Sequence, residues 1–180
     1  MAYAAWSVSF GEQPSAAKWN ILGTNDATFD ALIGSGTAWT SYTPTWTNLS
    51  VGTGGNAANV GAYQKFGKTV IFRVHVILGT SGSSVGTLPR FTAPTTVNAA
   101  QYQSSIGLSA TVGQATLLDA AITEYHGHVR VSSTAPTTSF DVTAWGSAST
   151  YVNVGSVTAT VPFTWAAGDG IYITGHYEAA

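Results

Sequence analysis

One stretch of the chain, residues 60–78, has the pattern of a β-hairpin. From residue 70 to residue 78 every second side chain is apolar, which is the period of a strand with one buried face. Gly67-Lys68 separates this run from an earlier strand-like run, and glycine at the first central position suits a two-residue type II′ turn. Such a turn pairs Tyr63 with Phe72. The stretch therefore predicts two antiparallel strands that share one buried face.

The rest of the chain after residue 40 also has the pattern of short strands. Segments rich in β-formers alternate with Gly, Ser, Thr and Pro, and no helix-length apolar period follows residue 36. Further strands are predicted at 104–112, 115–118, 121–125, 128–132, 138–145, 150–161 and 171–178. The predicted fold class is all-β, an antiparallel β-sandwich or jelly-roll-like domain at 41–180 preceded by a short N-terminal helical motif.

Residues 1–40 predict an attachment segment with two short helices. Ser15 fits the cap of a first helix that Gly23 ends, and Thr24 or Asn25 fits the cap of a second. Helices this short are marginal alone, because about 12–15 residues are needed even for favourable sequences. We therefore expect their large apolar side chains to dock on the β domain of the same chain, on symmetry mates or on another protein. These docking residues are Trp19, Leu22, Phe29 and Ile33.

Charged residues are unusually rare in this chain. They make up 8% of the sequence, against roughly 25% in ordinary globular proteins. Six Lys and Arg against eight Asp and Glu give a net charge of -2, so no basic surface for nucleic acid is expected. A monomer with so few charges has weak protection against association, which predicts an obligate oligomer. No segment approaches the roughly 18 apolar residues of a membrane span, and no membrane insertion is expected.

Two groups of segments resemble known viral proteins. Residues 10–23, followed by Asn25, Asp26 and Phe29, resemble the short N-terminal motif of bacteriophage minor tail and tail-fibre proteins. The second group is similar to the β domains that recur in tail proteins of phages infecting Gram-positive hosts. It comprises residues 42–46, 60–63, 67–70, 88–89 and 161–178. Residues 91–160 are not matched by these motifs.

The resemblance implies a structural protein of the phage virion that is synthesised in the host cytoplasm. It implies a homotrimeric tail-fibre or receptor-binding component whose N-terminal segment contacts other tail or virion proteins. The divergent middle of the chain would then contact a host cell-surface glycan. Two alternatives stay open: a capsid decoration or other non-adhesive virion protein, and a free carbohydrate-binding module.

The spacing of His126 and His128 allows two interpretations. On a continuous strand the two rings share a face, and three chains could offer six imidazoles to a metal ion, as some trimeric phage fibres do. Alternatively, His126-Gly127 forms a hairpin turn that places Ile122, Val129 and Val131 on one apolar face. The turn gives the better apolar face and is the preferred interpretation. No metal or other cofactor is therefore predicted.

Aromatic residues suggest a place for glycan contact. Trp145 and Tyr151 bracket residues 146–150, which have the composition of an exposed loop, and an aromatic ring face packs well on a sugar. We predict a glycan or receptor contact there. Arg73 and His75 lie on the non-core side of the central hairpin, where they could line a subunit interface or face solvent.

No pattern for catalysis is present, and the chain is predicted not to be an enzyme. Glu124 with Asp141 is the pair of acids that remains in the β region, and nothing in the sequence recommends it for glycoside cleavage. Asp169, between two glycines, is expected in a turn. The chain has no cysteine, no nucleophile elbow and no phosphate-binding loop. We therefore expect a binding or structural protein.

Overall fold

The structure is a computed structural model of the whole chain. It describes residues 13, 15–34, 38–103, 110–120, 122–148 and 151–180. The described elements are one α-helix, one short 3₁₀ turn and ten strands. They are α1 Ala16–Gly34, β1 Thr40–Tyr42, β2 Trp46–Ser50, β3 Ala58–Phe66, β4 Thr69–Ile77, β5 Ser84–Thr92, η1 Ala99–Gln101, β6 Thr111–Asp119, β7 Thr123–Val131, β8 Ser139–Ala148, β9 Tyr151–Ser156 and β10 Gly170–Glu178.

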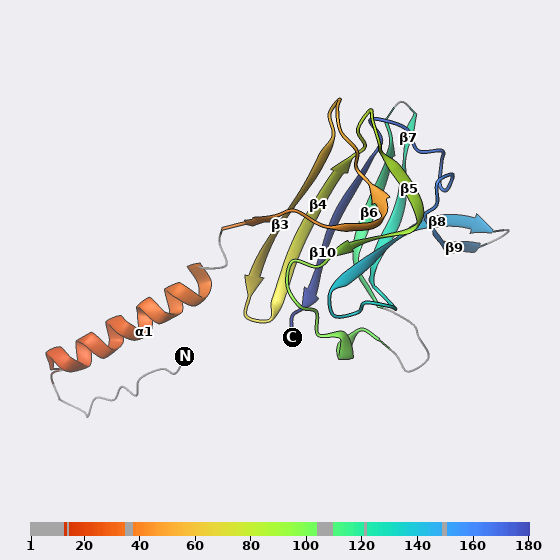
Figure 1. Ribbon diagram of the computed structural model, residues 1–180. Helices are drawn as coiled ribbons and strands as arrows, with labels where there is room; N and C mark the ends of the chain where they lie inside the picture. The colour runs from red at the N-terminus through yellow and green to blue at the C-terminus, as the bar shows by residue number, and fades with distance from the viewer. Residues whose placement is uncertain (1–12, 14, 35–37, 104–109, 121, 149–150) are drawn as a thin grey trace.

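The strands form one antiparallel sheet that curls over itself (Figure 1). Their order is β1-β3-β4-β10-β6-β7-β8-β5-β2, and β9 extends the pairing of β8. The curl is visible in the packing of Phe72 on β4, whose ring lies 6.1 Å from that of Phe91 on β5, although several strands separate β4 from β5 in the sheet. The prediction of an all-β, sandwich-like domain with a short N-terminal helical motif is confirmed.

The central hairpin has the predicted register. Tyr63 pairs with Phe72, and the two strands close across Phe66 and Thr69. Gly67 has a φ of 59°, the positive value that the first position of a type II′ turn requires. The alternate side chains from Val70 to Leu78 are all buried, as the apolar period indicates. They are Val70, Phe72, Val74, Val76 and Leu78.

The core lies inside the curl and is centred on aromatic rings. Phe72 stacks on Phe140 with ring centroids 5.2 Å apart, and Tyr177 packs against both rings. The Tyr177 hydroxyl donates to the carbonyl oxygen of Thr95 at 2.9 Å, so this buried polar group is satisfied. Each fully buried side chain of this size contributes on the order of 1.5–3 kcal/mol by leaving water. The core therefore fixes which face points inward on the strands that contribute side chains to it.

The predicted turn at His126-Gly127 is wrong, and residues 121–125 and 128–132 do not form two strands. β7 runs without interruption through this dipeptide, and Gly127 pairs with Ala144 on β8. Glycine is needed there for a different reason: a Cβ at residue 127 would overlap the backbone carbonyl oxygen of Thr143. Ile122 precedes the strand and is 78% exposed, so it does not join Val129 in the core.

Among the described residues of the N-terminal segment, one helix takes the place of the predicted two. α1 continues through Gly23, because a glycine inside a helix costs only about 1 kcal/mol relative to alanine and does not forbid the conformation. Thr24 does not cap a second helix; its hydroxyl donates back to the carbonyl oxygen of Asn20 at 2.8 Å. The predicted cap at the start is present, since the Lys18 amide donates to Ser15 Oγ at 3.3 Å.

The helix projects away from the sheet in Figure 1. Trp19 is 56% exposed and Leu22 is 41% exposed, and together with Gly23 and Asp26 they line a shallow hollow on the helix surface. Phe29 and Ile33 follow on the same helix, and their side chains lie outside the described residues. The placement of Trp19 and Leu22 leaves both available for docking.

Candidate binding groove on the outer face of the sheet

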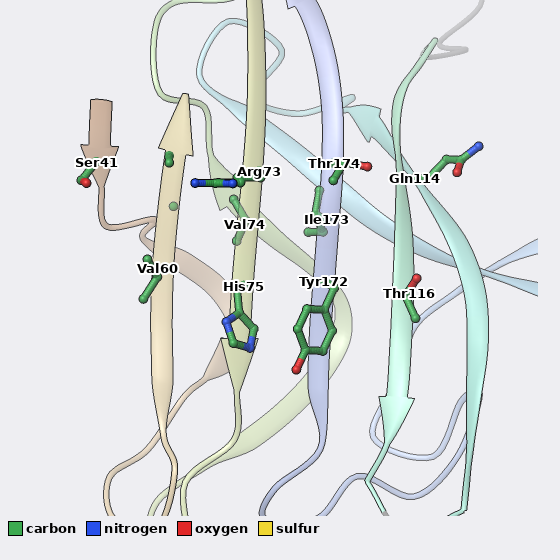
Figure 2. Close-up of a pocket in the computed structure, with 12 residues that line it drawn as sticks. Ser41, Val60, Arg73, Val74, His75, Gln114, Thr116, Tyr172, Ile173 and Thr174 are labelled. Carbon is green, nitrogen blue, oxygen red and sulfur yellow. The ribbon is translucent and has the colours of Figure 1, made fainter. Parts of the chain in front are cut away.

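A groove of about 520 Å³ lies on the outer face of the sheet, over β1, β3, β4, β10 and β6 (Figure 2). Its volume is within the range of about 300–1,000 Å³ that small-ligand sites occupy. Because core side chains take every second position on these strands, the intervening positions turn outward into the groove. The lining residues are Ser41, Val60, Gly61, Ala62, Arg73, Val74, His75, Gln114, Thr116, Tyr172, Ile173 and Thr174.

Strand register arranges the groove side chains in two rows across the sheet. One row contains successive partners on β3, β4, β10 and β6: Val60, His75, Tyr172 and Thr116. The next row contains Ala62, Arg73, Thr174 and Gln114. Each row therefore places a long polar or aromatic side chain between smaller ones, on a backbone that the ladder of hydrogen bonds holds rigid.

Two side chains of the first row, His75 and Tyr172, form an aromatic pair. The His75 and Tyr172 rings stack with centroids 4.4 Å apart and an interplanar angle of 20°. Tyr172 remains 39% exposed, whereas His75 is half-buried and its Nε2 atom is buried without a hydrogen-bond partner. Figure 2 shows the two rings side by side on neighbouring strands. Stacking on His75 restricts the Tyr172 ring, so this exposed aromatic surface is already positioned for a ligand.

Arg73 provides the positive charge of the second row. Its guanidinium carbon lies 4.3 Å from the ring centroid of Trp39, which is itself 40% exposed just before β1. This contact is a cation–π interaction, worth about 0.5–1 kcal/mol at an exposed site. It holds the guanidinium against the ring. The arginine is thus held in place by an aromatic neighbour.

The remaining polar groups of the groove are neutral. Ser41, Thr116 and Thr174 provide hydroxyls, and Gln114 provides an amide. None of the lining residues is Asp or Glu, so the groove as described offers no carboxylate for acid–base chemistry. The arrangement of one exposed aromatic ring, several hydroxyl and amide groups and one cation is suited to binding.

Sequence reasoning found part of this groove. It placed Arg73 and His75 on the outer side of the hairpin, which the structure confirms. It did not identify Tyr172 or Trp39. A signal for Tyr172 exists in the alternation of β10, because Ile171 and Ile173 are both buried and Tyr172 must then face outward. The position of β10 beside β4 has no such local signal.

The predicted glycan contact lies elsewhere on the outer face. Trp145 on β8 is 47% exposed, and its Nε1 donates to Nδ1 of His128 at 3.0 Å. Tyr151 on β9 pairs through its backbone with Ala148, three positions along β9 from Val154, the partner of Trp145. The side chain of Tyr151 lies outside the described residues. Of the two residues predicted to contact a glycan, only Trp145 therefore has a described side chain, and its ring is exposed.

His126 and His128 share the outer face of β7, as the continuous-strand interpretation requires. The His126 ring lies 6.3 Å from that of Trp145, and Nδ1 of His128 accepts the indole hydrogen bond. Burial, with Arg130 as the second cause, lowers the pKa of His128 and favours the neutral ring that accepts this bond. A neutral ring that accepts at Nδ1 carries its proton on Nε2, so His128 is arranged to hold Trp145. Within the described residues, no group of three or more potential metal ligands occurs.

Two acidic residues of the β domain, Asp141 and Asp169, have structural partners. Asp141 is fully buried, and its Oδ1 accepts a hydrogen bond from Arg90 Nε at 2.7 Å. Arg130 Nε lies 3.9 Å from the other carboxylate oxygen. Asp169 occupies the predicted turn, where its carboxylate accepts the backbone amides of Ala120 and Ala166. These two carboxylates therefore connect neighbouring segments of the fold.

Comparisons with protein-family models, curated proteins and solved structures found no match to this chain. The described part of the chain contains no helix with the length and apolar character that crossing a membrane requires. The geometry of the outer face therefore carries the functional argument, together with the motifs of the sequence.

Proposed function

We propose that this chain is a structural protein of a bacteriophage virion, a tail-fibre or receptor-binding component whose β domain binds a host glycan in the outer groove. The observation that carries the binding part of this proposal is the exposed Tyr172 ring, stacked on His75 and surrounded by neutral polar side chains. The viral part is supported by the motifs at residues 10–23 and 161–178 that resemble phage tail proteins.

The groove has the chemistry that a sugar requires. The face of a pyranose ring presents C–H groups that pack on an aromatic ring, and Tyr172 offers such a surface. The hydroxyls around the sugar ring need donors and acceptors, which Thr116, Thr174 and Gln114 can supply. Binding by a single shallow groove is weak, but several copies acting together on one surface gain through effective concentration.

The proposal includes a homotrimer that docks to the tail through its helix. Charged residues at 8% and exposed large apolar side chains on α1 both support burial against other chains. Light scattering on the purified chain is expected to give a mass about three times 18.6 kDa. A particle of 18.6 kDa that stays single at micromolar concentration would contradict the trimer and favour a free carbohydrate-binding module.

The glycan proposal is tested by Tyr172→Ala. Loss of the ring removes the stacking surface while the backbone of β10 is unchanged, and we expect binding to isolated host cell walls to weaken at least about 10-fold. The comparison variant is Trp145→Ala, which removes the exposed ring of the other candidate contact, outside the groove. If Trp145→Ala abolishes binding and Tyr172→Ala does not, the groove is the wrong site.

A further inference from the structure

Arg73 is a cation that the fold positions but does not neutralise. Within the described residues both ion pairs are made by Asp141, which binds Arg90 and lies near Arg130. Arg73 is instead held by the ring of Trp39, at 4.3 Å. A ring face attracts the cation without cancelling its charge. The groove therefore retains a full positive charge at a fixed place.

The neighbours of Arg73 do not neutralise its positive charge. Its partners across the sheet are Ala62 on β3 and Thr174 on β10, and neither carries a charge. No carboxylate is among the residues that line the groove. A neutral ligand would have to leave Arg73 hydrated, whereas an anionic ligand can bind it with charge-assisted hydrogen bonds, which are about twice as strong as neutral ones.

The aromatic ring and the cation line the same groove, so one extended ligand can contact both. Arg73 is two residues from His75 on β4, and His75 pairs directly with Tyr172 on β10. Two residues along a strand span about 7 Å, and Tyr172 lies one strand further across, so a ligand that contacts both side chains must be an oligosaccharide of more than one sugar. Figure 2 shows the Arg73 side chain directed toward the strand that carries Val60, whereas the Tyr172 ring lies beside His75 further along the groove.

Resting on the glycan-binding function proposed above, we propose that the groove selects an anionic glycan. One sugar ring of the glycan lies on Tyr172, and the carboxylate or phosphate group of another unit along the chain is bound by the N–H groups of Arg73. The Trp39 ring holds the guanidinium and none of the groove residues is a carboxylate, so the N–H groups of Arg73 can donate to an anion. Arg73 thus provides the selectivity for acidic over neutral sugars, and Tyr172 provides the stacking surface that any sugar needs.

The test is an array that presents acidic and neutral oligosaccharides to the full chain. Hexuronate oligomers and sugar-phosphate polymers form two acidic arms, and uncharged oligosaccharides of the same length form the neutral arm. We expect an acidic arm to bind about 10- to 100-fold more tightly than the neutral arm, and this preference to fall as salt is raised. Comparison of the two acidic arms identifies whether the anion is a carboxylate or a phosphate.

Arg73→Met is the variant that isolates the charge. Methionine keeps an apolar stem against Trp39, so the fold is expected to be retained, and an unchanged unfolding temperature confirms it. We expect Arg73→Met to bind acidic and neutral arms equally. Lys65→Met is the matched control, because it removes one positive charge from an exposed position on β3 outside the groove. Lys65→Met is expected to keep the preference.

Each outcome separates the two proposals. Equal binding of acidic and neutral arms by the unmodified chain overturns the anionic selectivity but leaves glycan binding intact. An acidic preference that survives Arg73→Met also overturns the assignment to Arg73. Binding to no member of any arm contradicts glycan binding itself, and the selectivity with it.

Discussion

Replacement of Gly127 by alanine is expected to lower the free energy of unfolding by about 3 kcal/mol, the upper part of the range for overpacking. An added Cβ would overlap the carbonyl oxygen of Thr143, and it would also lie 3.2 Å from the Cα of Ala144. Both atoms belong to the backbone of β8, so no side-chain rotation can relieve the contact. We expect the loss to appear in denaturant unfolding and as a melting temperature lower by roughly 10 °C.

Gly155→Ala is the matched control for this change. Gly155 also lies in a strand, β9, and an added Cβ there meets no atom within 4 Å. Its effect on the free energy of unfolding is expected to stay within about 0.5 kcal/mol. If the two alanine variants unfold at the same denaturant concentration, the close approach of β7 to β8 at Gly127 is not a real constraint on the fold.

Asp141→Asn is expected to have an effect of similar size, about 3 kcal/mol. The side chain keeps its shape but loses the charge that faces Arg90 at 2.7 Å and Arg130 at 3.9 Å. Breaking a buried ion pair on one side costs about 3–5 kcal/mol because the partner is left uncompensated. The low end applies here, since the Arg90 and Arg130 side chains are 21% and 34% exposed and water can solvate part of their charge.

Glu124→Gln provides the comparison for Asp141→Asn. Glu124 is an exposed carboxylate on β7, and its conversion to an amide is expected to change the free energy of unfolding by no more than about 0.5 kcal/mol. Both variants are measured by chemical denaturation at neutral pH. Equal midpoints for Asp141→Asn and Glu124→Gln would show that the row of Arg90, Asp141 and Arg130 does not stabilise the sheet.

Local patterns predicted the parts of the fold that local forces determine. The alternation around Phe72 and the turn at Gly67 specified the central hairpin to the residue. The shared face of Ile171, Ile173 and Tyr177 is buried as the alternation of β10 indicates. In each case the turn chemistry or the apolar period is contained within a few neighbouring residues.

Glycine misled the sequence reasoning because it has two structural roles. Gly127 was predicted to lie in a turn because glycine is common in turns. It lies instead in a strand, where the backbone of β8 approaches too closely for a side chain. Gly23 was predicted to end a helix because glycine is common just after helix C-termini, yet α1 continues through it. The identity of one residue cannot distinguish these roles. For Gly127 the contact that decides is with a strand distant in the sequence, and for Gly23 it is the helix on both sides of it.

The candidate groove could not be predicted from the sequence for a related reason. Its two rows depend on β10 lying between β4 and β6, and this order joins segments about one hundred residues apart. Arg73 and His75 were recognised as facing outward from their own strand. Tyr172 and Thr174 lie beside them only because β10 pairs with β4. The sequence offers no local signal for that pairing.

The central position of β10 has a consequence for how the protein is made. Residues 170–178 leave the ribosome after β4 and β6, yet they fill the gap between these two strands. Until they arrive, β4 and β6 each present an unpaired edge, and sequence-distant pairing of this kind is slow. During this interval the chain is partly assembled, and its two unpaired strand edges are open to misassociation.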